Sequence, residues 1–236
     1  MTTSTPKLKL YTNHGCPWAH RVHIALAELN IPFEEEIIDL SVPRTPEYLK
    51  INPRGLVPSI SYNGKIITES AIVANFLADA FPSHLIPAST DANGPLVRAK
   101  IAFFVDTYFS KAAPHYFKTS FGKLEEERTA AGVEFVNTVA KELDPLLADA
   151  APFFGGSSKL TQAEVLTGSF VLRLYTFARP EHGLQPISLD DLAAKAPNFD
   201  KWAREVSKHP SVTGIWNEEK MVSYTKERLS KLRAQA

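Results

Sequence analysis

The stretch that most constrains this chain is Asn13-His14-Gly15-Cys16-Pro17-Trp18-Ala19-His20-Arg21, where a short strand is followed by a glycine turn and a helix. Proline suits the first helical turn because its fixed φ is already helical and its missing N–H needs no partner there. Cys16, the only cysteine, then falls at the helix N-cap, where unpaired backbone N–H groups and the helix dipole favour a thiolate. The alternative is a buried structural cysteine, which has no need of a Gly-Cys-Pro helix start. We therefore expect Cys16 to be a nucleophile.

The composition is that of an ordinary globular protein with one large domain or two small ones. The 236 residues include 26 acidic and 26 basic ones, so no overall field attracts nucleic acid or an anionic membrane. A single cysteine excludes an internal disulfide and favours a reducing compartment. No stretch approaches the roughly 18 apolar residues of a membrane span, and residues 1–6 lack the apolar core of a signal peptide. These features predict a cytoplasmic protein.

The histidines show no spacing typical of metal ligands. His14, His20 and His23 cluster in the sequence without a neighbouring carboxylate or thiolate, so we expect them at the surface or behind the site residues. The sequence therefore predicts no metal.

Hydrophobic periodicity in the first part of the chain predicts a small α/β domain over residues 1–82. Alternating residues predict strands, helical stripes predict helices, and Asn63-Gly64 predicts a type I′ hairpin. A strand, a helix and a strand in this order imply a parallel pair with a right-handed crossover. The predicted order is βαβ then αββα, with strands at 7–12, 33–39, 59–62 and 65–68 and helices after Cys16, at 46–51 and from Glu69-Ser70.

The second part of the chain predicts an all-α helical bundle. Residues 83–94 are rich in Pro, Ser and Asn and form the expected linker, and residues 95–236 contain no convincing strand. Thr161 and Glu164 form a capping box before a helix that is apolar nearly all round, which must be central to the bundle. The stretch from Asn217 is expected to be a charged helical tail.

Two further motifs suggest a peptide ligand that carries a thiol. If the Val57–Pro58 bond is cis, the backbone of Val57 is free to pair with a peptide beside Cys16; the alternative is an ordinary trans proline on an edge strand. At a helix start, Ser70 can bind a carboxylate and Glu69 an ammonium group, or both can simply cap the helix. Glutathione carries all of these groups.

With these motifs in view, the chain resembles the cytosolic glutathione transferases over nearly its whole length. Cys-Pro-x-Ala is similar to the cysteine-dependent omega-type members and to the glutathionyl-hydroquinone reductases. The resemblance implies a thioredoxin-like domain, a helical domain, glutathione as co-substrate and a homodimer. It is carried by Cys16-Pro17-Trp18-Ala19, Asn52-Pro53-Arg54-Gly55-Leu56-Val57-Pro58, Glu69-Ser70, Thr161 to Glu164 and His209-Pro210-Ser211-Val212.

The resemblance also implies roles for individual residues. Cys16 takes the place of the catalytic thiol. Leu56 and Thr45 stand where other members often have a lysine for the glycine carboxylate, so that role passes to Arg44. The full expected glutathione site consists of Trp18, Arg44, Leu56, Val57, Pro58, Glu69 and Ser70. Tyr108, Phe109, His115, Phe117 and Trp216 are expected to line an apolar acceptor pocket between the domains, although aromatics at helical spacing can also be plain core.

These roles predict a glutathione-dependent thiol transferase that forms a Cys16–glutathione mixed disulfide, acting on disulfides, dehydroascorbate or glutathionyl conjugates. With no second cysteine in the chain, another glutathione must release the bound one. The alternatives are a glutathionyl-hydroquinone reductase, suggested by Trp18 and His20-Arg21, and a carrier of apolar aromatics with the same fold.

Overall fold

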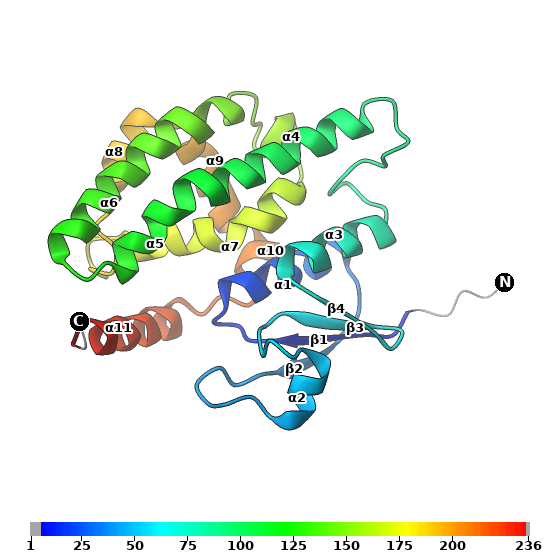
Figure 1. Ribbon diagram of the computed structural model, residues 1–236. Helices are drawn as coiled ribbons and strands as arrows, with labels where there is room; N and C mark the ends of the chain where they lie inside the picture. Colours follow the sequence, from blue (N-terminus) through cyan, green and yellow to red (C-terminus); the bar gives the residue numbers. More distant parts are fainter. Residues whose placement is uncertain (1–5, 235–236) are drawn as a thin grey trace.

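The computed structural model describes residues 6–234, in which a small mixed sheet with its helices lies beside a bundle of helices (Figure 1). The sheet has the order β2-β1-β3-β4, and β1 pairs parallel with β2 and antiparallel with β3. Helices α1 and α3 cover the face toward the bundle and α2 the opposite face (Figure 1). The elements are β1 (Leu8–Thr12), α1 (Pro17–Leu29), β2 (Glu34–Ile37), α2 (Pro46–Ile51), β3 (Ser59–Tyr62), β4 (Lys65–Thr68) and α3 (Ser70–Ala80). The predicted βαβ-αββα order is confirmed.

The hairpin between β3 and β4 follows directly from its turn residues. Asn63 and Gly64 have φ values of 49° and 81°, the left-handed region that both central residues of a type I′ turn require. Tyr62 pairs with Lys65 across this two-residue turn, as the sequence predicted.

Strand β2 is shorter than predicted and forms one edge of the sheet. It covers Glu34–Ile37 rather than residues 33–39, and every one of its residues is exposed. In its register with β1, Glu35 lies opposite Leu10. Because successive side chains alternate between faces, Glu35 shares the face of the buried Leu10, which α1 covers, while Glu34 and Glu36 share the face of Lys9.

Beyond β4 the described residues contain helices and no further strand, in agreement with the predicted all-α domain. A π-helical turn joins α4 to α5, and a second one follows α6. The elements are α4 (Gly94–Thr107), the π-turn Tyr108–Ala112, α5 (Ala113–Phe121), α6 (Glu125–Thr138), the π-turn Val139–Leu143, short 3₁₀ turns at Asp144–Leu147 and Phe154–Gly156, α7 (Gln162–Phe177), α8 (Leu189–Lys195), α9 (Pro197–Lys208), α10 (Pro210–Thr213) and α11 (Glu218–Ala234). Within the described residues, no helix is long and apolar enough to cross a membrane.

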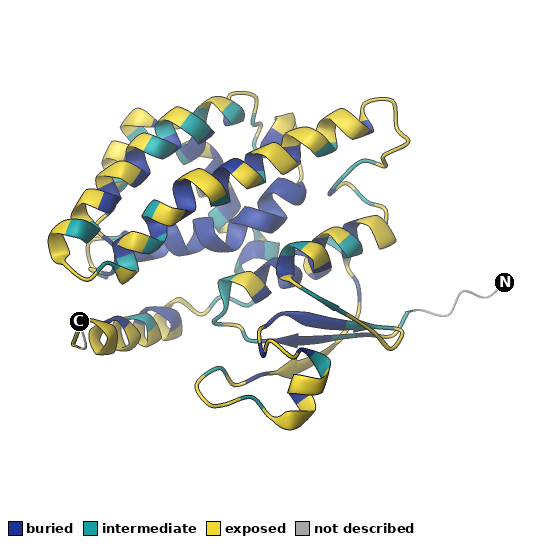
Figure 2. Cartoon of the chain, in the orientation of Figure 1, coloured by how far each residue is buried: buried dark blue, intermediate teal, exposed yellow. Residues whose placement is uncertain are grey.

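Helix α7 is the centre of the bundle, and nearly all of it is buried (Figure 2). Its N-terminus has the capping box: Thr161 Oγ1 accepts from the Ala163 N–H at 3.2 Å, and Glu164 accepts from the Thr161 N–H at 2.7 Å. Glu164 also accepts from the Thr161 hydroxyl at 2.7 Å, the Phe154 N–H at 2.8 Å and Trp202 Nε1 at 2.6 Å. Complete burial raises the pKa of this carboxyl group, and the four donors oppose that rise.

The C-terminal helix α11 is more than a solvated charged tail. Met221, Val222 and Leu229 are buried, and a methyl group placed on Gly15 would lie 3.7 Å from Met221 Cε. Helix α11 therefore packs next to the turn that precedes Cys16. Its apolar residues are too few to reveal this packing among the charges around them.

Candidate active site

Cys16 occupies the N-cap of α1 and is half-buried. The turn before it is held by the Cys16 N–H, which donates to the Asn13 carbonyl at 2.9 Å, and by the Gly15 N–H, which donates to Asn13 Oδ1 at 2.9 Å. The thiol does not cap the helix itself, and its Sγ lies 3.9 Å from the carbonyl oxygen of Val57. The sulfur is therefore placed at a helix N-terminus and remains available for chemistry.

A pocket of about 450 Å³ opens beside this sulfur. It brings together all the residues expected to contact glutathione, which come from α1, the loop before α2, the segment before β3 and the start of α3. The Val57–Pro58 peptide bond at its wall is cis, as the sequence suggested. The lining consists of Cys16, Trp18, Arg21, Leu40, Arg44, Asn52, Gly55, Leu56, Val57, Pro58, Glu69, Ser70 and Ala71.

Glu69 and Ser70 start α3 with an unusual backbone. Glu69 is the N-cap and has φ 69° and ψ 115°, outside the regions that non-glycine residues normally adopt. Its carboxylate accepts from Arg54 Nη1 at 2.6 Å, and the Ser70 hydroxyl accepts from Arg21 Nη1 at 3.1 Å. Neither side chain caps the helix, so the N–H groups of the first turn of α3, which starts at the pocket wall, have no side-chain acceptor from this pair. Simple capping, the alternative considered for this pair, is wrong.

Arg44 lines the pocket but is already occupied by backbone acceptors. Its Nε donates to the Gly55 carbonyl at 3.0 Å, and its Nη1 donates to the carbonyls of Asp39, at 2.6 Å, and Val42. The guanidinium group thus fastens the loop before α2 to the segment before β3. A role in binding the glycine carboxylate would require these bonds to be given up, so the structure does not favour that expectation.

Arg21 lines the pocket from α1 and is buried. Its Nε donates to the Leu166 carbonyl at 2.7 Å, and its guanidinium carbon lies 4.6 Å from the ring centre of Trp18 and 4.4 Å from that of Phe109. Burial lowers the pKa of Arg21 to about 9.

Arg173 reaches the same region from α7. Its Nη1 donates to the Ser169 carbonyl at 2.9 Å and to His20 Nδ1 at 3.2 Å, and its Nη2 donates to the Gly15 carbonyl at 3.3 Å. Burial lowers the pKa of Arg173 to about 10. Among residues 6–234, neither Arg21 nor Arg173 forms an ion pair with a carboxylate. The signal for Arg173 was present in the sequence: it is an arginine within a helix otherwise apolar nearly all round.

Two of the three clustered histidines, His20 and His23, are buried, so of the two expected positions, at the surface or behind the site residues, the first is wrong for them. His20 is fully buried, its Nε2 donates to the Val212 carbonyl at 2.8 Å, and its Nδ1 accepts from Arg173. Burial and the neighbouring Arg173 charge lower the pKa of His20 well below its usual value. His23 is buried as well, at 6% exposure. Helix α1 lies between the sheet and the bundle, so its polar face is covered too.

Comparison with known proteins shows which family the chain resembles. Residues 15–80 match the family model described as "Glutathione S-transferase, N-terminal domain". The chain is 26% identical over 215 residues to glutathione S-transferase omega-1 of Sus scrofa, which covers 88% of this chain and 80% of that protein. The crystal structure of glutathione transferase Omega 2C from Trametes versicolor is 29% identical, with a TM-score of 0.79, and covers 95% of this chain and 99% of that one. The N-terminal domain thus matches the glutathione S-transferase family, and the relatives that cover nearly the whole chain are glutathione transferases, including members of the omega class.

A second solved structure supports the same assignment for this transferase. Rice GST1 in complex with glutathione is 26% identical with a TM-score of 0.81, and the match covers 97% of the transferase and 99% of the rice chain. The rice structure and the omega structure confirm the expected thioredoxin-like and helical domains, and the omega relatives confirm the omega-like resemblance.

Of the five residues expected to line an acceptor pocket, Tyr108, Phe109 and Phe117 cluster around Phe170, whereas His115 and Trp216 lie elsewhere in the transferase. Phe109 and Phe117 both contact Phe170, as edge-to-face pairs at 5.1 and 6.2 Å between ring centres. Tyr108 is buried against Phe109, and Trp216 stacks near Arg173 at 4.9 Å. His115 lines a separate hollow between α5 and α6. The alternative that aromatics at helical spacing are core describes Tyr108 and its neighbours better.

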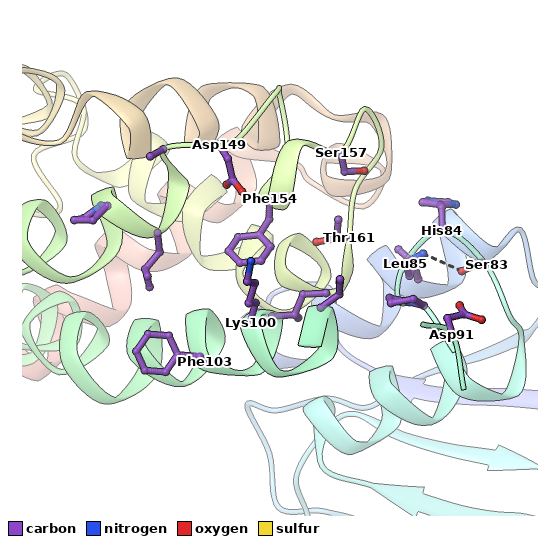
Figure 3. A pocket seen from close by; sticks show the side chains of 17 residues that line it. Ser83, His84, Leu85, Asp91, Lys100, Phe103, Asp149, Phe154, Ser157 and Thr161 are labelled. Carbon is purple, nitrogen blue, oxygen red and sulfur yellow. Dashed lines mark hydrogen bonds between the residues drawn. The ribbon is translucent and has the colours of Figure 1, made fainter. Parts of the chain in front are cut away.

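A larger hollow lies away from Cys16. It has a volume of about 890 Å³, and Figure 3 shows its lining residues coming from the segment before α4, from α4 itself and from the loop before α7. Ser83, Lys100, Phe154 and Thr161 are among them. None of the residues expected to bind glutathione lies there, so its size does not make it the active site of the transferase.

Proposed function

We propose that this glutathione transferase is a glutathione-dependent thiol transferase in which Cys16 carries the glutathionyl group as a mixed disulfide. The observation that carries the proposal is the surroundings of Cys16. Its sulfur lies at a helix N-terminus, and the buried guanidinium groups of Arg21 and Arg173 nearby have no carboxylate partner within residues 6–234. Buried cations without anionic partners favour an anion close to them, and a Cys16 thiolate supplies one.

The reaction consists of two thiol–disulfide exchanges. The Cys16 thiolate attacks the glutathionyl sulfur of a mixed disulfide, the Cys16–sulfur bond forms, and the electron pair of the broken S–S bond leaves with the acceptor thiolate. The thiolate of a second glutathione then attacks the bound glutathionyl sulfur, which yields oxidised glutathione and restores the Cys16 thiolate. The chain has one cysteine, so the second step depends on free glutathione.

The other pocket residues would orient the glutathione peptide. We place its backbone along Val57, where the carbonyl oxygen faces Cys16 at 3.9 Å, and its γ-glutamyl end at the start of α3. There the N–H groups of the helix and the Ser70 hydroxyl would bind the carboxylate, and Glu69 would accept from the ammonium group. Trp18 and Leu56 would contact apolar parts of the bound molecule.

The test of this proposal is Cys16→Ser. We expect reduction of hydroxyethyl disulfide and of dehydroascorbate to fall by orders of magnitude, because the only nucleophile able to hold glutathione as a disulfide is lost. The glutathione Kd, measured by calorimetry, should stay within about threefold, because the expected peptide contacts remain. Mass spectrometry of wild type treated with oxidised glutathione should show one added glutathionyl group, which the variant lacks.

A matched variant separates binding from chemistry. Ser70→Ala keeps the thiol and removes one expected ligand for glutathione, so it should weaken glutathione binding while saturating oxidised glutathione still modifies Cys16. Unchanged disulfide reduction in Cys16→Ser would refute the proposal. So would a wild-type enzyme that conjugates chlorodinitrobenzene rapidly but reduces no disulfide.

We also infer that the enzyme acts in the cytoplasm as a two-fold homodimer. Support comes from the family resemblance and from the single cysteine, which suits a reducing compartment. Light scattering of the purified protein at micromolar concentration tests the dimer, and fractionation of the source cells tests the compartment.

A further inference from the structure

A group of two histidines and a glutamate lies outside the glutathione pocket. His14 is in the turn before Cys16, His23 is on α1, and Glu35 is on the edge strand β2. His14 Nε2 lies 2.8 Å and His23 Nε2 lies 3.5 Å from the same atom, Glu35 Oε1. All three ligand atoms lie within 4.8 Å of one another, and within residues 6–234 no other set of His, Cys, Asp or Glu meets this criterion.

The fold explains how residues far apart in the sequence converge here. The parallel register sets Glu35 opposite Leu10, on the sheet face that α1 covers (Figure 1). His23 is on the part of α1 that packs over this face, and the turn from β1 into α1 brings His14 to its rim. The sequence suggested no carboxylate near these histidines because Glu35 reaches them only through strand pairing.

We propose that His14, His23 and Glu35 bind one divalent transition-metal ion of the Zn²⁺ type. Two imidazoles and one carboxylate form a common zinc ligand set that leaves a fourth position for water. With metal–ligand bonds of about 2.0–2.1 Å, tetrahedral ligand atoms lie about 3.3 Å apart. The 3.5 Å separation at His23 already matches that spacing, and the 2.8 Å separation at His14 requires an opening of about half an ångström.

The accessibility and charge of the group suit a metal ion. The side chains of His14 and Glu35 are 45% and 33% exposed, so an ion can reach them, while that of His23 is buried, at 5%. Glu34 and Glu36 flank the ligand on the same strand, and only Glu36 is neutralised, by Lys9 at 2.6 Å. The local field therefore favours a cation.

Two separate hydrogen bonds are the competing account. In that account Glu35 accepts from His14 Nε2 at 2.8 Å, while His23 Nε2 is hydrogen-bonded to the Thr12 hydroxyl at 2.9 Å and only lies near Glu35, at 3.5 Å. A metal would take the His23 nitrogen from Thr12 and leave that hydroxyl free to bond the metal-bound water. The two accounts differ in whether the protein binds metal and in whether all three side chains are needed.

The experiment uses the full chain with Cys16→Ser, so that no thiol can bind the probe. Zn²⁺ titration by calorimetry should give one site with micromolar or tighter Kd. His14→Ala and Glu35→Gln change partly exposed side chains and should each weaken Zn²⁺ binding at least about tenfold. Co²⁺ should give the visible absorption of a tetrahedral site in the parent, and both substitutions should abolish it.

His84→Ala is the matched control. His84 Nε2 lies 2.8 Å from Glu28 Oε2, the same length as the His14 pair, and His209 lies 3.6 Å from the other oxygen of Glu28. The ligand atoms of this set do not all lie within 4.8 Å of one another. The Zn²⁺ affinity of His84→Ala should therefore stay within twofold of the parent protein. Absence of Zn²⁺ binding at 100 µM, or binding that His14→Ala and Glu35→Gln leave unchanged, would overturn the proposal.

Discussion

Removal of the Thr161 hydroxyl should destabilise the protein far more than loss of an ordinary helix cap. In Thr161→Ala the Ala163 N–H loses its acceptor, and Glu164, which is fully buried, loses a charge-assisted bond of 2.7 Å. Loss of an N-cap costs about 0.5–2 kcal/mol, and a hydrogen bond to a charged group contributes about 1.5–3 kcal/mol. We expect the free energy of unfolding to fall by about 3 kcal/mol. For a chain of this size that corresponds to a Tm lower by about 6–12 °C.

The assay is urea unfolding followed by far-UV circular dichroism, with the slope m checked for constancy. Thr161→Ser keeps the hydroxyl and should stay within about 1 kcal/mol of wild type. Ser188→Ala removes the cap of α8, where the Ser188 hydroxyl accepts from the Asp191 N–H at 3.0 Å without a buried carboxylate, and should cost about 1 kcal/mol. If Thr161→Ala loses no more stability than Ser188→Ala, the reasoning about Glu164 is refuted.

Three further predictions follow from the buried charges and the loop contacts. The pKa of His20 is lowered in the folded state, so the unfolded chain binds more protons below about pH 6.5 and the free energy of unfolding falls as the pH drops. In His20→Gln the dependence of this free energy on pH, measured by urea unfolding between pH 5 and 7, should be weaker by up to about 1.4 kcal/mol per pH unit. An unchanged pH dependence would contradict this prediction. Arg21→Met should slow the alkylation of Cys16 by iodoacetamide at pH 7. The free energy of unfolding should change by less than about 2 kcal/mol, because removal of a buried charge offsets the lost hydrogen bond to a buried carbonyl. An alkylation rate equal to that of wild type would count against the role of Arg21. Arg44→Lys should lower Tm as much as Arg44→Ala, because a lysine cannot donate to all the carbonyl groups that Arg44 binds. If Arg44→Lys keeps the wild-type Tm and glutathione affinity while Arg44→Ala loses both, Arg44 is instead a carboxylate ligand.

Local signals were sufficient for most of the architecture. The Asn63-Gly64 turn, the Gly-Cys-Pro helix start and the Thr161 capping box each depend on residues within a few positions of one another, and each element begins where those residues indicate. The ends of β2 could not be predicted from local residues because its glutamates do not alternate with apolar residues. Only the pairing with β1 defines where this strand begins and ends.

The parts of the site that the sequence did not reveal depend on packing between distant segments. Arg173 approaches Cys16 only because α7 crosses α1, and their separation in the sequence hides this proximity. Arg44 was chosen for its charge, but its charge is used within its own loop. The aromatic residues of the π-turn after α4 and of α5 could be assigned to a pocket or to the core only from the packing of the bundle.

The edge strand β2 also bears on how copies of this protein behave at high concentration. An edge strand presents unpaired N–H and carbonyl groups along its free side, and these can template the addition of a strand from another molecule. Here that free side belongs to a segment with three consecutive glutamates, of which Lys9 balances one. Two such edges brought together would set carboxylates against carboxylates, which is destabilising between adjacent strands. The carboxylates that would attract a metal ion thus also oppose pairing of β2 with the same strand of a second molecule, which is the step that would extend the sheet from one copy to the next.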